Sequence, residues 1–93
     1  MRKVSHKVEN GKMVKLGLDI QQKGIEGVEI RGDFFLQPPE KLEELEEKIQ
    51  SLDVDSTVED VEKSLKNFNA DMIGFSPEDL GKAFRKAVEG DEK

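Results

Sequence analysis

Cysteine is absent from this 93-residue sequence. Its absence excludes disulfide bonds, thiolate nucleophiles, cysteine-type zinc sites and iron–sulfur ligation by cysteine. Tryptophan and tyrosine are absent as well, and histidine occurs once. No apolar run approaches the ~20 residues that span a membrane, and no signal-peptide pattern follows Met1. We therefore expect a cytoplasmic protein without a membrane partner.

Acidic residues outnumber basic ones by 21 to 15, which gives a formal net charge of −6. A nucleic-acid partner is not expected, because binding to phosphates requires a basic surface. The balance differs along the chain, since residues 1–31 contain seven Lys or Arg and four acids, whereas the remainder is strongly acidic. A solvated surface is the simplest interpretation of the mildly basic first third, and a dedicated anion site is the alternative.

Apolar and polar residues alternate through the first third of the chain, at the period of two that β-strands require. Asn10-Gly11 predicts a tight turn after the first strand, and Gln21–Gly24 predicts a second turn. Two consecutive hairpins give a three-stranded antiparallel sheet. We expect its strands at about residues 2–8, 12–20 and 25–32. Its buried face is predicted to comprise Val4, His6, Val8, Val14, Leu16, Leu18, Ile20, Val28, Ile30 and Phe34.

Helical spacing replaces the alternation after Pro38-Pro39, with Pro39 expected at the first helical position. Ser56 and Glu59 have the spacing of a capping box for a second helix. Ser76-Pro77 predicts the start of a third. We expect these helices at about residues 39–51, 57–67 and 77–89.

The helices provide the cover that the apolar face of the sheet needs. Met72-Ile73-Gly74-Phe75 links the second and third helices and is expected to tuck into the core. A chain of this length forms one domain. The sequence thus predicts a single α+β domain, residues 1–93, with three helices covering one face of a three-stranded antiparallel sheet.

Residues that commonly perform catalysis occur here without suitable neighbours. His6 shares a strand face with valines, which favours a packed or edge histidine over a catalytic or metal-binding one. The pairs Glu43-Glu44 and Glu46-Glu47 fall on a helical face that is expected to be solvated. Asp53-Val54-Asp55-Ser56 lacks the glycine and bidentate glutamate of a calcium loop. We therefore expect no catalytic, cofactor-binding or metal-binding residue, and no enzyme activity of this chain by itself.

Gly32-Asp33-Phe34-Phe35 stands where the strand pattern ends and the helical pattern begins. Glycine permits a bend, and one phenylalanine can seal the core. Two adjacent phenylalanines cannot both face the same side of a strand, so one ring is expected to be partly exposed, which would suit a partner surface.

At this turn the sequence resembles the accessory C-terminal domain of lipoate–protein ligases, which in some archaea is a separate small subunit. The resemblance covers about half of the chain directly. Gly32-Asp33-Phe34-Phe35 is its most specific part, with a proline and an acidic, leucine-rich helix just after it. The resembling stretches are Lys7–Lys15, Val28–Phe35, Pro38 or Pro39, and Leu42–Glu46.

The resemblance implies a scaffold similar to iron–sulfur assembly proteins of the SufE/NifU type. It also implies that the catalytic lysine and the nucleotide and lipoate sites belong to a catalytic subunit, with which this chain would form a heterodimer. Together they would use ATP, magnesium and lipoate to form lipoyl-adenylate, and would serve lipoyl-acceptor domains indirectly. The chain begins at Met1 without an upstream catalytic region, which fits the separate subunit, although an excised domain would look the same.

Partner contacts are expected at the turn and on the basic strand face. A free-standing interaction or scaffold module related to iron–sulfur assembly proteins is the alternative, against which the absence of cysteine argues. The residues expected to contact the catalytic subunit are Asp33, Phe34, Phe35, Lys3, Lys15 and Arg31.

Overall fold

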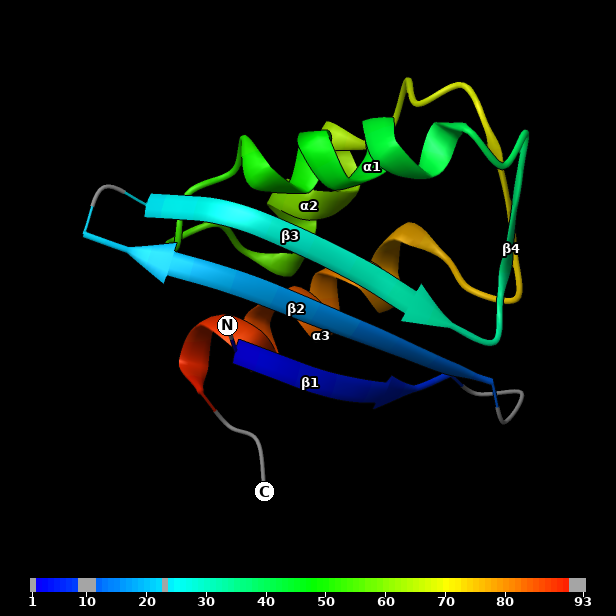
Figure 1. Ribbon diagram of the computed structural model, residues 1–93. Coiled ribbons are helices and arrows are strands. Elements are labelled where there is room, and N and C mark those ends of the chain that lie inside the picture. The colour runs from blue at the N-terminus through cyan, green and yellow to red at the C-terminus, as the bar shows by residue number, and fades with distance from the viewer. Residues whose placement is uncertain (1, 9–11, 23, 91–93) are drawn as a thin grey trace.

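A computed structural model describes residues 2–8, 12–22 and 24–90 of the chain. It confirms the α+β class: three antiparallel strands in the order β1-β2-β3 lie against three helices (Figure 1). The turn predicted at Asn10-Gly11 lies outside the described residues. The principal elements are β1 (Arg2–Lys7), β2 (Met13–Gln21), β3 (Gly24–Gly32), α1 (Lys41–Gln50), α2 (Val58–Ser64) and α3 (Pro77–Glu89).

The sheet register follows the alternation of the sequence. Val4 on β1 pairs with Leu16 on β2, which pairs with Ile30 on β3, and all three side chains are buried. Each strand therefore turns its apolar positions toward the helices. The outer face of the sheet carries the polar positions between them.

A β-bulge interrupts this alternation close to the turn that joins β2 and β3. Asp19 pairs with Gly27, but Ile20 pairs with Ile25, so Glu26 is an extra residue on β3. A bulge reverses the alternation beyond it. As a result Ile25, which the simple alternation placed outside, is buried. Val28, which pairs with Leu18 before the bulge, keeps its predicted face but is only half-buried.

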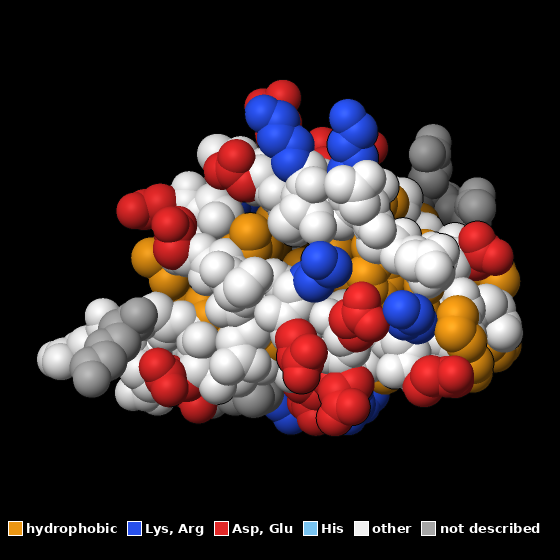
Figure 2. Space-filling view, turned by 90° about the horizontal axis from the view of Figure 1, so that it is seen from above, with side chains coloured by type: hydrophobic (Ala, Val, Ile, Leu, Met, Phe, Trp, Pro, Cys, Tyr) orange, Lys and Arg blue, Asp and Glu red, His pale blue; other side chains and the backbone are white. Residues whose placement is uncertain are grey.

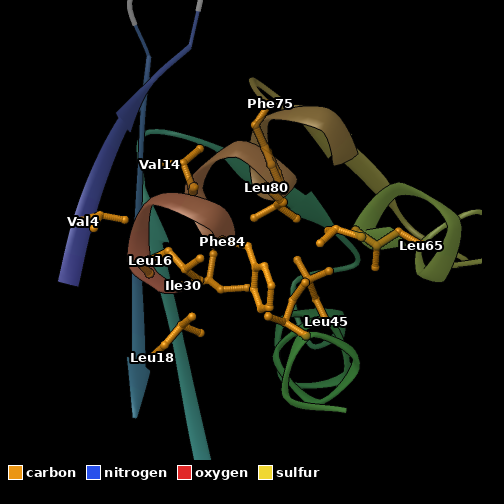
Figure 3. Close-up of a cluster of buried hydrophobic side chains, with 14 of the residues drawn as sticks. Val4, Val14, Leu16, Leu18, Ile30, Leu45, Leu65, Phe75, Leu80 and Phe84 are labelled. Carbon is orange, nitrogen blue, oxygen red and sulfur yellow. The ribbon is translucent and has the colours of Figure 1, made fainter. Parts of the chain in front are cut away.

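All three helices lie on the same side of the sheet, and α1 and α3 cover its apolar face (Figure 1). α3 packs on β1 and β2, α1 packs on β3, and α2 packs on α3. The ring of Phe84, on α3, lies between Ile30 and Leu16 of the sheet and Leu45 of α1 (Figure 3). Phe84 and Leu45 are completely buried. One hydrophobic core thus joins the sheet to all three helices.

The helix boundaries differ from the sequence expectation at two ends. α1 begins at Lys41 with Glu40 as N-cap, because Pro38 and Pro39 form a turn before it, in which Lys41 N donates to the Pro38 carbonyl at 3.0 Å. α2 ends at Ser64 rather than near residue 67. The chain tightens there into bonds between residues three apart, such as Lys66 N to the Lys63 carbonyl at 3.2 Å.

The capping box of α2 lies one residue later than the sequence suggested. Thr57, not Ser56, is the N-cap: its hydroxyl accepts from Asp60 N at 3.1 Å, and the Asp60 carboxylate accepts from Thr57 N at 3.0 Å. Ser56 is instead buried and lies beside Asp53. Both Ser56-x-x-Glu59 and Thr57-x-x-Asp60 have capping-box spacing, and the packing of the preceding loop decides between them.

Two short strands that the sequence did not predict form a second sheet. β4 (Phe35–Gln37) pairs antiparallel with β5 (Asp71–Ile73). They lie at the end of the molecule where β3 finishes (Figure 1). The expectation that residues 72–75 tuck into the core is wrong for Ile73, which is exposed, whereas Phe75 is buried. Strand pairing across more than thirty residues leaves no local signal, and alternation in β5 turns Ile73 outward.

Candidate functional site

The turn at Gly32 is fixed to the neighbouring strand. Gly32 has a φ of +150°, and a Cβ there would collide with the carbonyl oxygen of Met13. The next residue, Asp33, donates its backbone N–H to that same oxygen at 2.9 Å. Glycine is therefore required both by the backbone conformation and by the close approach of β2. The side chain of Asp33 is left exposed.

Phe34 points inward from this turn and is half-buried. Its ring packs on that of Phe75, with centroids 4.4 Å apart and planes tilted by 47°. Gly74, beside this ring pair, has a φ of +97°, which strains other residues, although a Cβ there would make only ordinary contact, 3.4 Å from the Asp33 carbonyl oxygen and from the Phe34 α-carbon. Phe34 thus joins the turn to the segment that leads into α3.

Phe35 points the other way, and 67% of its surface is exposed. Its cross-strand partner is Ile73, which is 49% exposed, so the two apolar side chains lie on the same outer face of the β4–β5 sheet. Leu36, the next residue on β4, points to the opposite side of the β4–β5 sheet and is buried. The expectation that one of the two adjacent rings is exposed is confirmed. Ile73 was missed because its exposure depends on the pairing with β4.

The basic residues of the strand face come together on the outer face of the three-stranded sheet. Lys15 on β2 pairs with Arg31 on β3, and Lys3 on β1 pairs with Gly17. Glu29 lies between the cations: Lys3 Nζ is 3.7 Å and Arg31 Nη2 is 3.6 Å from its carboxylate. These side chains line a hollow of about 200 Å³. This basic face belongs to a different sheet from Phe35.

Glu46 on α1 is not a solvated carboxylate, contrary to the sequence expectation. It is half-buried, and its Oε2 accepts from Ile30 N at 2.9 Å and lies 3.3 Å from Arg31 Nη1. An amide on the outer edge of β3 is therefore satisfied by a helix side chain. That edge also offers the Glu26 carbonyl to Gln50 of α1, at 3.1 Å. Both contacts protect an edge that could otherwise pair with another strand.

His6 lies in a polar chain between β1 and α3, at the wall of a cleft of about 690 Å³. Lys86 Nζ is 3.2 Å from Nδ1, and Asp79 Oδ1 is 3.3 Å from Nε2. An ammonium group can only donate, so Nδ1 accepts and Nε2 donates its proton to Asp79. Asp79 also accepts from the backbone N and hydroxyl of Ser76, at 2.9 Å each. His6 is packed, as its strand face predicted, and it anchors the start of α3.

One carboxyl group has a clearly shifted pKa. The hydrogen bonds from Thr57, first from its backbone and then from its side chain, lower the pKa of Asp60 below its ordinary value of 3.8, and Lys63 adds to the effect. These interactions belong to the cap of α2 and need no ligand. Within the described ranges, no three His, Cys, Asp or Glu residues are grouped so that they could hold a metal ion.

No helix among the described residues is long and apolar enough to cross a membrane. Comparison with known proteins gave one family: the sequence model described as the C-terminus of bacterial lipoate protein ligase matches residues 1–84. That match spans both sheets, α1, α2 and most of α3. No curated protein and no solved structure matched the chain. The similarity to SufE/NifU-type scaffolds stays a prediction.

Proposed function

From the premise that this chain belongs to the family of bacterial lipoate protein ligase C-termini, we propose that it is the accessory part of a two-part lipoate–protein ligase. Membership of the family supports a role in protein lipoylation. The finer proposal is that the chain, docked on a catalytic subunit as a heterodimer, is required for ATP-dependent formation of lipoyl-adenylate. The family match over residues 1–84 carries this proposal.

The catalytic subunit contributes the reacting groups in this proposal, and this chain contributes a surface. Docking would favour the conformation of the catalytic subunit that forms the adenylate, which requires only that the chain bind that conformation more tightly than the others. A preference of about 1.4 kcal/mol would change the ratio of the two conformations tenfold. The complex would use ATP, magnesium and lipoate, and lipoyl-acceptor domains would meet it afterwards, in the cytoplasm.

Two surfaces are candidates for the contact. The first is the basic face, in which Lys3, Lys15 and Arg31 surround Glu29. The second is the end of the molecule at Asp33, Phe34 and Phe35, where Phe34 supports the turn from within and Phe35 is exposed. The first would act mainly through charge and would weaken with salt, whereas the second would act through burial of apolar surface.

Lipoate-dependent formation of AMP and pyrophosphate by the catalytic subunit tests the proposal. Adding this chain should raise the rate in a saturable way, with a half-maximal concentration that equals the Kd of the complex. Transfer from chemically prepared lipoyl-adenylate to an acceptor domain should change much less, because that step begins after the adenylate exists. Equal rates of adenylate formation with and without the chain would disprove the accessory role.

A further inference from the structure

The Phe35–Ile73 pair is an exposed apolar feature that the fold does not explain. Among the described residues, these two are the large hydrophobic side chains with the most exposure, 67% and 49%. They are directly opposite each other on β4 and β5, so they form one continuous patch and not two isolated side chains.

The rest of the Gly32–Phe35 turn has a structural explanation. Gly32 avoids a collision with the Met13 carbonyl, Asp33 donates its backbone N–H to that carbonyl, and Phe34 packs on Phe75. Phe35 has no comparable role, because its strand position turns it away from the core while Leu36 faces inward. An aromatic ring at such a position is typical of the apolar centre of a protein interface.

The border of the patch is acidic. The segments that form and flank β4 and β5, residues 33–40 and 69–75, contain no Lys or Arg. Their three acids, Asp33, Glu40 and Asp71, are all exposed. Asp71 lies on β5 itself, two residues from Ile73. The patch therefore suits an apolar pocket with a basic border, because opposite charges at the border guide and orient the contact.

We propose that the outer face of the β4–β5 sheet, centred on Phe35 and Ile73, is the surface that docks on the catalytic part of the lipoate ligase. This proposal depends on the proposed function. ATP and the carboxylate of lipoate are anionic, so a catalytic part that binds them would carry cations, and the acidic segments of this chain would complement such a basic surface. The patch is the apolar contact, and the basic face of the three-stranded sheet is not the primary docking surface.

Titration of the catalytic subunit with this chain, followed by isothermal calorimetry, tests the assignment. The informative variant is Phe35→Ala, and Ile73→Thr is the second, because threonine keeps the β-branched shape that strands favour. Each should raise the Kd about tenfold or more, as truncation at the centre of an interface does. Lys15→Ala, in the basic face, tests the competing surface and should stay within about twofold of the unchanged chain. The matched control is Lys82→Ala on α3, whose exposed side chain lies outside both candidate surfaces. Circular dichroism of each variant checks that the fold is retained.

Charge reversal at the border gives a separate readout. Asp71→Lys should weaken binding at low salt, and the difference from the unchanged chain should shrink as salt is added. Binding by Phe35→Ala and Ile73→Thr that matches the unchanged chain would overturn the docking assignment alone. Loss of binding in Lys15→Ala instead would assign docking to the basic face and overturn it too.

Two further measurements address different questions: whether the chain has the accessory role at all, and which molecule covers the patch. No binding of the unchanged chain to the catalytic subunit would refute the accessory role itself and, with it, this occupant. Sedimentation of the chain alone is the second measurement, with a monomer expected at micromolar concentration. A dimer that Phe35→Ala dissociates would assign the patch to a second copy of this chain and overturn the proposal.

Discussion

Arg85 on α3 donates from Nη1 to the carbonyl oxygen of Ser56 at 2.9 Å, and from the same nitrogen to the Val54 carbonyl at 2.9 Å. The loop before α2 is thereby held against the side of α3. Ser56 is buried in this arrangement, and the N-cap falls on the next residue, Thr57. The guanidinium group thus helps to hold the loop that leads into α2.

Replacing Arg85 by Met should destabilise the protein, because two partly buried carbonyl groups lose a charged donor. Hydrogen bonds to charged groups contribute about 1.5–3 kcal/mol, and we expect a loss in that range. The matched control is Lys82→Met on the same helix, whose exposed ion pair with Glu78 is worth less than about 0.5 kcal/mol. Urea unfolding of both variants measures the difference, and equal midpoints would contradict the role given to Arg85.

Gly32→Ala should be much more destabilising than Gly24→Ala. Both glycines have a positive φ, +150° and +124°, so alanine is strained at each position. At Gly24 a Cβ would meet open space, whereas at Gly32 it would collide with the Met13 carbonyl. We expect about 1–2 kcal/mol at Gly24, and at least about 2 kcal/mol more at Gly32 because β2 and β3 must separate. Thermal unfolding of the two variants checks the order, and similar losses would show that the collision is relieved without disturbing the sheet.

Glu46→Ala should leave the Ile30 N–H without its acceptor. That amide lies on the outer edge of β3 and receives its bond from the Glu46 carboxylate at 2.9 Å. An unsatisfied, partly buried donor is unfavourable by about 1–3 kcal/mol, and Glu46→Gln should recover most of this because its amide oxygen also accepts. Hydrogen exchange of the Ile30 amide measures the effect locally. Unchanged protection in Glu46→Ala would show that the bond is not formed in solution.

The cap of α2 should make stability depend on pH in the acid range. The pKa of Asp60 is lower in the folded protein than the ordinary 3.8, so the carboxylate stabilises the fold at pH values above 3.8. That contribution declines as pH falls from the ordinary value through the lowered folded pKa, because the unfolded chain takes up the proton first. Asp60→Asn should flatten the stability curve in this interval. A variant whose curve runs parallel to that of the unchanged chain down to pH 2.5 would contradict the assignment.

Local sequence patterns determined the three-stranded sheet, its buried face and the three helices. Val14, Leu16 and Leu18 alternate on β2, and all are buried, because a strand exposes its two faces in turn. Ser76-Pro77 correctly predicts the start of α3, because the groups that form this cap lie within one helical turn of each other in the sequence. The Gly32–Phe35 turn also predicted one exposed ring, since adjacent strand residues face opposite ways.

Contacts between distant segments decided the remainder. Only the fold pairs Phe35 with Ile73, assigns Glu46 to the edge of β3, and places Lys86 and Asp79 on either side of His6. The bulge that buries Ile25 likewise depends on how β3 pairs with β2. The spacing of residues along a chain records which face of an element they occupy. Which distant element meets that face depends on how the whole core packs, and no local pattern contains that information.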